Sequence, residues 1–222
     1  MKIIKLKHGS IQRKPANQWI HWLACSVVAL STATLIACGS SQAEKSAPPV
    51  DPGNAEPRAE EQQTTERGQF VDSAVSGLFY ETNSGEGFTD HDGYFDYQEN
   101  EAIGFYIGNI ALGFAPAAEI LTPTDITGSE DGISDAAINV LRLLQTLDED
   151  GDPSNGISIS ANTHRVASQI PEGAINVFTD SQEFAQNETL LSLIGQVTNV
   201  SGLVATENAV SHFRATQQQL AR

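Results

Sequence analysis

The sequence predicts an α+β domain in which a small antiparallel β subdomain, residues 69–127, is followed by a helical subdomain, residues 128–222. In the first part, short apolar and aromatic segments alternate with clusters of Gly, Asn, Asp and Ser, which is typical of strands joined by tight turns. In the second part, apolar residues recur at spacings of three and four, which indicates amphipathic helices. Because a few short strands cannot bury a face by themselves, we expect the helices to cover a half-sandwich or curled sheet.

The β subdomain is expected to contain three or four short strands, which lie over 75–80, on either side of a turn within 88–97, over 103–107 and over 110–112. The turns between them are expected at residues 83–87, 90–93 and 108–109, where Gly, Asn and Asp gather. The segment from Asp90 to Gly93 is interpreted as the turn of a hairpin, because alone it offers too few ligands for more than half of a metal site.

Aromatic side chains are frequent in this subdomain. Strand alternation directs about half of them into the core, and the others could form a platform that stacks on a sugar. The residues concerned are Phe79, Tyr80, Tyr94, Phe95, Tyr97, Phe105 and Tyr106.

The helical subdomain is expected to contain four helices. Ser134 is the predicted N-cap of the first, which ends at Asp148 and carries a wide apolar face of Ile138, Val140, Leu141, Leu143, Leu144 and Leu147. Ser160 is expected to cap a second helix that runs to about Ile170, before Pro171. A third helix is expected over 187–197, with Leu190, Leu191 and Ile194 on one side. Thr206 is expected to cap the last helix, which should bury Val210, Phe213 and Leu220.

The first 37 residues have the layout of a secretory signal peptide. They carry basic residues at Lys2, Lys5, Lys7, Arg13 and Lys14, have no acidic residue, and continue into an apolar run over 22–37. That run is shorter than the roughly 20 residues that a spanning helix needs. The stretch 38–68 that follows is rich in Pro, Glu, Gln and Ser, so we expect a disordered tether there.

The junction Leu35-Ile36-Ala37-Cys38-Gly39 resembles the lipobox of bacterial lipoproteins. The resemblance implies that Cys38 becomes the first residue of the mature protein and carries acyl chains, palmitate among them, that attach it to a membrane. Gly39 stands where an aspartate would retain such a protein at the inner membrane, which implies the outer membrane, with either leaflet open. Cys25 would leave with the signal peptide, so the mature chain is expected to contain no disulfide.

The chain is strongly acidic, with 28 Asp and Glu against 12 Lys and Arg and a formal charge of −16. Removal of the basic signal peptide would make this charge more negative. Such a chain is not expected to bind nucleic acid through its phosphates. It can recruit cations, and the same acidity can also serve only to keep the protein soluble.

The most informative acidic segment is the loop 148–157, where aspartates alternate. Asp148, Asp150, Asp152 and Asn155 are candidate calcium ligands, because calcium prefers six to eight oxygen atoms. The loop departs from an EF-hand in having Pro153 at the place of the invariant glycine, and no glutamate at the twelfth position. The alternative is a solvated turn from a helix to a strand.

The sequence contains no motif of a known catalytic site, whether a Gly-x-Ser-x-Gly elbow, a His-Glu-x-x-His zinc helix or a phosphate-binding glycine loop. His164 and His212 are isolated in the sequence and are expected on helix faces. We therefore expect a protein that is not an enzyme, with no catalytic residue to name.

Residues 70–217 resemble an uncharacterised module of secreted and lipid-anchored bacterial proteins. The likeness rests on Thr-Asp-x-x-Gly-x-Phe-x-Tyr at 89–97, Ile-Gly-x-Ile-x-Leu-Gly at 107–113, and Leu-Leu-Gln-Thr-Leu-Asp-x-Asp-Gly-Asp-Pro-x-Asn-Gly-Ile at 143–157. The first of these motifs also recurs in carboxypeptidase-regulatory-like β-sandwiches.

The module resemblance implies a place in the cell envelope. The expected role is a binding or adhesion module, with calcium as a candidate stabilising ion, that contacts an unidentified protein or glycan. The alternatives are a structural or assembly accessory of an envelope machine and a degenerate hydrolase-associated domain.

Overall fold

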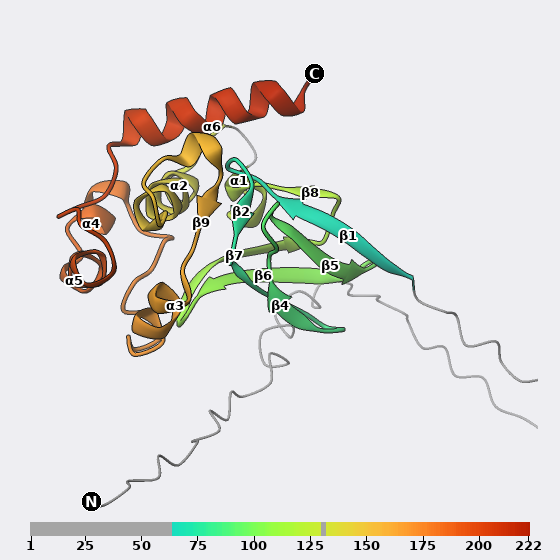
Figure 1. Ribbon diagram of the computed structural model, residues 1–222, viewed down its shortest axis with the longest axis horizontal. Coiled ribbons are helices and arrows are strands. Elements are labelled where there is room, and N and C mark those ends of the chain that lie inside the picture. Colours follow the sequence, from blue (N-terminus) through green and yellow to red (C-terminus); the bar gives the residue numbers. More distant parts are fainter. Residues whose placement is uncertain (1–63, 130–131) are drawn as a thin grey trace, which may run out of the picture. The chain divides into compact units, whose positions relative to one another are not determined.

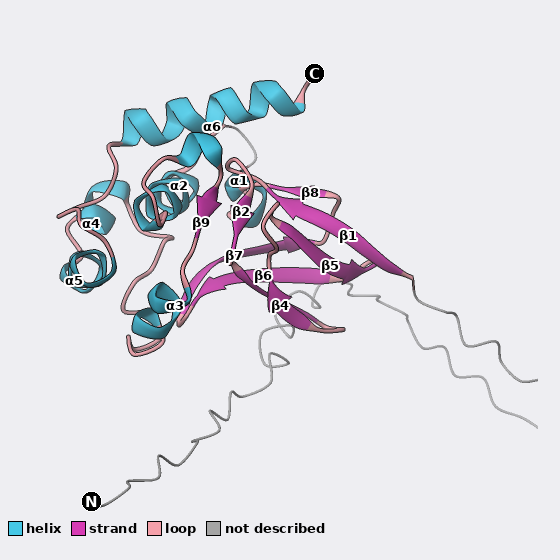
Figure 2. Cartoon of the chain, in the orientation of Figure 1, coloured by secondary structure: helices cyan, strands magenta, loops and turns pink. Residues whose placement is uncertain are grey.

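The computed structural model describes residues 64–129 and 132–222. Within them, strands gather on one side and helices on the other, and most strands precede the helices in the chain (Figures 1 and 2). This confirms the predicted α+β class. The predicted signal peptide 1–37, the lipidation site Cys38 and most of the predicted tether lie outside the described residues.

A four-stranded antiparallel sheet has the strand order β4-β3-β6-β7. Its strands are β3 (Phe79–Thr82), β4 (Glu86–Phe88), β6 (Ala102–Ile107) and β7 (Ile110–Pro116). The turn at 108–109 connects a hairpin, as predicted. The turn predicted over 83–87 is shorter, because β4 begins at Glu86 and pairs with β3. β7 continues past the predicted end at Leu112, because a bulge opposite Phe105 and Tyr106 lets pairing with β6 resume as far as Pro116.

A second sheet corrects the predicted end of the tether. β1 (Thr65–Phe70) begins inside the segment 38–68 and pairs antiparallel with β5 (Tyr94–Gln98) and parallel with β8 (Ile120–Leu121). The exposed start of β1 has the composition of a tether, but β5 supplies a partner for its backbone. Only the tertiary structure provides that partner.

The strand predicted over 75–80 is divided at Gly77. β2 (Val75–Ser76) pairs in parallel with β9 (Ile157–Ser158), whereas β3 joins the four-stranded sheet. Gly77 has a φ of 71°, and a Cβ there would lie 2.4 Å from the Ile159 carbonyl oxygen. Glycine is therefore required where the chain turns from one sheet into the other.

The segment from Asp90 to Gly93 forms the predicted turn, but not a hairpin. The Asp90 carboxylate accepts hydrogen bonds from the backbone amides of Asp92 and Tyr94, both at 2.9 Å. The strands on either side belong to different sheets, since β4 pairs with β3 and β5 pairs with β1. The turn thus carries the chain between sheets.

The helices are α1 (Pro123–Ile126), α2 (Asp135–Leu147), α3 (Ala161–Ala167), α4 (Ser181–Ala185), α5 (Glu188–Val197) and α6 (Thr206–Leu220). The side chains of Ser134 and Ser160 accept N-capping hydrogen bonds, as predicted. Two details differ from the prediction: α3 ends before Ile170, and Ala205 rather than Thr206 is the N-cap of α6. The short helices α1 and α4 were not predicted, because each is little more than one turn and shows no periodicity.

One hydrophobic core joins the two predicted subdomains. It combines aromatic rings of the sheets, such as Phe70 and Phe105, with Leu143 of α2 and Leu190 of α5. α6 packs on α2 through a smaller cluster, which consists of Leu141, Ala209 and Phe213. Leu220 is exposed, contrary to the prediction, because the buried positions of α6 end at Thr216.

Candidate functional site

The acidic loop connects α2 to β9. Asp150 accepts hydrogen bonds from the backbone amide of Asp152 at 2.9 Å and from the Asn155 side-chain amide at 3.0 Å. Asp152 instead turns to Ser154, accepting from its amide at 3.1 Å and its hydroxyl at 2.6 Å. The structure therefore brings Asp148, Asp150 and Asn155 together at one side of the loop and engages the Asp152 carboxylate elsewhere.

Asp148 differs from the other aspartates of the loop because it is 6% exposed. Its Oδ1 accepts a hydrogen bond from the Ser158 amide at 2.9 Å, while its buried Oδ2 has no partner among the described residues. Burial, and then its contact with the charged Asp150, raise the pKa of Asp148. The hydrogen bond from Asn155 lowers the pKa of Asp150, which stays charged.

A metal site in this loop would need oxygen ligands of more than one kind. Within the described residues, no group of three or more His, Cys, Asp or Glu side chains is arranged to hold a metal ion. A site in the loop would therefore need amide, backbone or water oxygens beside the two carboxylates, and calcium accepts such ligands.

The outer side of the four-stranded sheet carries a row of aromatic side chains. Phe79 lies opposite Phe88 on one neighbouring strand and opposite Tyr106 on the other, and cross-strand partners share a face. Phe114 pairs with Gly104, two residues before Tyr106, and so lies on the same side. We call Phe79, Phe88, Tyr106 and Phe114 the aromatic face.

The aromatic face is open to solvent at both ends. Phe88 is 58% exposed and Phe114 is 68% exposed, while Phe79 and Tyr106 are half-buried between them. The Phe79 ring centroid lies 5.2 Å from that of Phe88 and 6.3 Å from that of Tyr106. The Tyr106 side chain extends over Gly104, where its hydroxyl would lie 2.8 Å from an added Cβ.

Carboxylates accompany these rings. Glu81 pairs with Glu86 and with Gly104, which places both glutamates on the same side of the sheet as the aromatic face. Burial, and then the charge of Glu81, raise the pKa of the Tyr106 hydroxyl, so this group remains a hydrogen-bond donor at neutral pH. The face thus combines flat apolar rings with a donor and two acceptors.

His164 borders the aromatic face at the end of α3. Its Nδ1 accepts a hydrogen bond from the Gly108 amide at 3.1 Å, and its Nε2 lies 2.7 Å from the Gly77 carbonyl oxygen. A neutral ring protonated at Nε2 satisfies both contacts. Phe88 packs edge-on against this imidazole at 5.1 Å between centroids, so the position of Phe88 depends on α3 as well as on the sheet.

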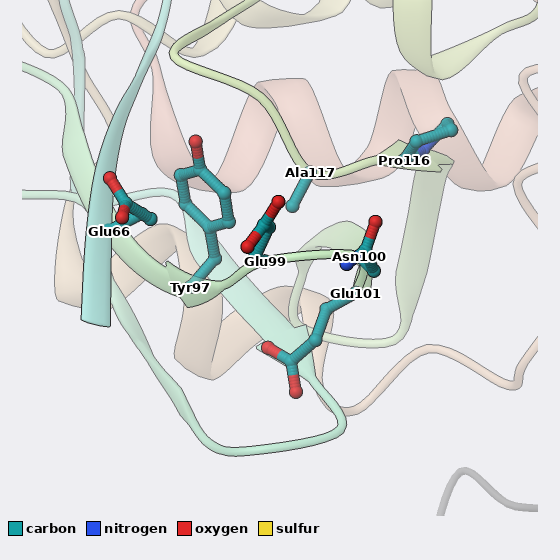
Figure 3. Close-up of a pocket in the computed structure, with 7 residues that line it drawn as sticks. All are labelled: Glu66, Tyr97, Glu99, Asn100, Glu101, Pro116 and Ala117. Atoms are coloured by element: carbon teal, nitrogen blue, oxygen red, sulfur yellow. The ribbon is translucent and has the colours of Figure 1, made fainter. Parts of the chain in front are cut away.

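A separate hollow lies around Tyr97, with Glu66 and Glu99 beside the ring (Figure 3). Burial, and then the charges of Glu66 and Glu119, raise the pKa of Tyr97. Glu101 also lines the hollow but accepts hydrogen bonds from the Ser84 hydroxyl and the Gln98 amide. The hollow is therefore an acidic depression in which one carboxylate holds neighbouring turns together.

Ser73, His212 and Asp72 meet beneath α6. The Nε2 atom of His212 lies 3.1 Å from the Ser73 hydroxyl and 3.9 Å from Asp72 Oδ1. In a Ser-His-Asp triad the carboxylate contacts the other ring nitrogen, so this cluster lacks the geometry of a triad. Asp72 is instead a buried group that receives a hydrogen bond from Gln145 of α2 at 2.9 Å.

No helix of the described residues is both long and apolar enough to cross a membrane. Comparisons with models of protein families, with curated proteins and with solved structures find no match to this chain.

Proposed function

We propose that this protein is a non-enzymatic lipoprotein of the bacterial outer membrane, which binds a neutral glycan through the aromatic face. The observation that carries the binding role is the exposure of Phe88 and Phe114 at the two ends of one aromatic row. Exposed apolar groups that gather on one surface mark interaction sites more often than single exposed residues do. The resemblance of Leu35-Ile36-Ala37-Cys38-Gly39 to a lipobox supports the membrane attachment.

The chemistry of the face fits a polysaccharide. A pyranose ring presents a flat apolar side of C–H groups, which packs on an aromatic ring, and equatorial hydroxyls around its edge. Phe88, Phe79 and Tyr106 follow one another across neighbouring strands, so successive rings are available to an extended chain. Glu81, Glu86 and the Tyr106 hydroxyl can exchange hydrogen bonds with sugar hydroxyls.

The charge of the face selects among polymers. Glu81 and Glu86 lie beside the rings, and the whole chain has a formal charge of −16. Like charges across an interface disfavour binding. An acidic polysaccharide or a nucleic acid would therefore be repelled, and a neutral glycan is the favoured occupant.

The glycan proposal is tested by electrophoresis of the full chain through gels that contain neutral polysaccharides, namely a β-glucan, an α-glucan, a mannan and a galactan. At least one should retard the protein, whereas alginate, an acidic polymer, should not. The double variant Phe88→Ala/Phe114→Ala should lose about tenfold or more in affinity, because it removes two stacking rings. Absence of retardation by every neutral polymer would refute the proposal.

Phe178→Ala is the matched control for the double variant. Phe178 is 52% exposed and lies outside the aromatic face, in the loop before α4, so its truncation should leave retardation unchanged. The thermal midpoints of all variants should agree closely with that of the wild type, since exposed side chains contribute little to stability. Equal losses for Phe178→Ala and the double variant would indicate non-specific hydrophobic contact instead.

Membrane attachment is tested separately through Cys38. The wild-type protein, expressed in a bacterium with an outer membrane, should incorporate radiolabelled palmitate and sediment with the outer membrane. Cys38→Ser should do neither, because no thiol would remain at the lipobox. Cys25→Ser is the control and should behave as the wild type, and labelling that survives Cys38→Ser would contradict the assignment.

A further inference from the structure

We infer that the loop between α2 and β9 binds a calcium ion through the carboxylates of Asp148 and Asp150 and the side-chain oxygen of Asn155. This inference does not depend on the glycan proposal, since the loop and the aromatic face are built from different residues. It rests on an unpaired buried carboxylate oxygen beside a second carboxylate.

Asp148 supplies the first part of the argument. The residue is 6% exposed, and its Oδ2 has no hydrogen-bond partner within the part of the chain that the structure describes. A buried acceptor without a partner costs free energy, and the cost is larger for a charged group. The atom therefore requires a proton or a cation.

Asp150 supplies the second part. Its carboxylate is held next to Asp148 by hydrogen bonds from the Asp152 amide and the Asn155 side chain, at 2.9 and 3.0 Å. Asp148 is equally constrained, because its other oxygen accepts from the Ser158 amide. Two carboxylates that cannot move apart repel one another, and a cation shared between them turns this repulsion into attraction.

Asn155 and the loop backbone complete the ligand set. The Asn155 amide nitrogen donates to Asp150, which leaves the Asn155 side-chain oxygen as an acceptor close to that carboxylate. Calcium takes oxygen ligands of mixed type and fills remaining positions with carbonyl groups and water. Magnesium demands stricter octahedral geometry, and the loop 148–157 contains no His or Cys that would favour zinc.

A bound ion would brace the connection between the helices and the sheets. Asp148 ends α2 and forms a bridge with Ile159, while β9 pairs with β2 at the junction where the chain enters β3. Calcium would thus stabilise the folded chain by mass action, in proportion to its occupancy of the loop.

The test is calorimetric titration of calcium chloride into the purified full chain after removal of metals with EDTA, together with thermal unfolding. We expect one site with a dissociation constant of about 10⁻⁴–10⁻³ M, the range of extracellular calcium modules. A calcium concentration of about 10 mM should then raise the thermal midpoint by several degrees, and magnesium should raise it less. If calcium produces neither heat nor a shift, Asp148 holds a proton and the inference is wrong.

Variants separate a specific site from general attraction to an acidic protein. Asp148→Asn and Asp150→Asn should each weaken calcium binding at least tenfold, whereas Asp92→Asn, the same charge change in the β4–β5 turn, should not. Asp148→Asn keeps the acceptor for the Ser158 amide, so its midpoint in EDTA should equal or exceed that of the wild type. Equal calcium affinity in Asp150→Asn and Asp92→Asn would overturn the inference.

Discussion

Asp72→Asn is expected to make the protein more stable at neutral pH and to remove much of the pH dependence of its stability. Asp72 is fully buried, and burial raises the pKa of its carboxyl group from 3.8 to about 7, against the opposing hydrogen bond from Gln145. Between these two values the folded protein retains a proton that the unfolded chain has lost. The unfolding free energy of the wild type therefore falls as pH rises from about 4 to about 7.

The size of this effect follows from the shift. Each pH unit in that interval costs about 1.4 kcal/mol, so the total is on the order of 4 kcal/mol. The asparagine introduced by Asp72→Asn does not titrate and can still accept from Gln145, so the variant should avoid this loss. Urea unfolding at intervals of pH measures the difference between the two proteins.

The unfolding free energies of wild type and Asp72→Asn are compared at each pH because His212 also titrates. Burial lowers the pKa of its imidazole, while its hydrogen bond with the Asp72 backbone and the charge of Asp152 act in the opposite direction. Because the pKa of His212 is lower in the folded protein than in the unfolded chain, its titration lowers the unfolding free energy as pH falls. This pH dependence is opposite in sign to that of Asp72. Both proteins keep the burial of His212, its hydrogen bond with the backbone of residue 72 and the charge of Asp152, so these contributions cancel, whereas its contact with the Asp72 carboxylate does not. Parallel pH profiles for wild type and Asp72→Asn would show that Asp72 carries no raised pKa.

Phe105→Ala is expected to be the most destabilising single truncation of the sheet core, at about 3–5 kcal/mol of unfolding free energy. Phe105 is fully buried, and its ring centroid lies 4.6 Å from that of Phe70 and 5.4 Å from that of Phe95. Its removal leaves a cavity where both sheets meet the helices. Urea unfolding, with the midpoint and slope compared with wild type, measures the loss.

Phe114→Ala provides the comparison for Phe105→Ala on the neighbouring strand. Its exposed ring should contribute within about 0.5 kcal/mol, as surface substitutions usually do. The same change, Phe to Ala, then separates a core position from a surface position in one sheet. Similar losses for the two variants would mean that the inner and outer sides of the sheet are not as assigned.

The comparison of these two phenylalanines also shows where sequence reasoning stops. Simple alternation along β7, starting from the buried Ile110, would place Phe114 on the buried side. The bulge pairs Phe105 with Gly113 and Tyr106 with Ala111, so Leu112 is an additional residue and the alternation shifts by one. The glycine at position 113 is the sequence signal for such a bulge, and its φ in the structure is 148°. The position of the bulge, however, depends on packing against Ile126 of α1.

The acidic loop shows the same limit of sequence reasoning. Alternating aspartates identified Asp148, Asp150, Asp152 and Asn155 together, and their spacing could not distinguish among them. Folding separates them, because the amide of Ser158 and the burial of Asp148 come from β9, whereas Asp152 folds back on Ser154. A signal for β9 was the apolar alternation at Ile157 and Ile159 directly after the loop.

The α+β class, the turns at 90–93 and 108–109, the capped starts of α2 and α3, and the acidic loop could be predicted from the sequence, because these features depend on neighbours within a few residues. Contacts between distant segments set the division of the strand at Gly77, the single core shared by sheets and helices, the start of β1 at Thr65, and the side of the sheet on which Phe114 lies. Each of these depends on a partner far away in the chain, such as β9 for β2 or β5 for β1, and local propensity carries no information about such partners.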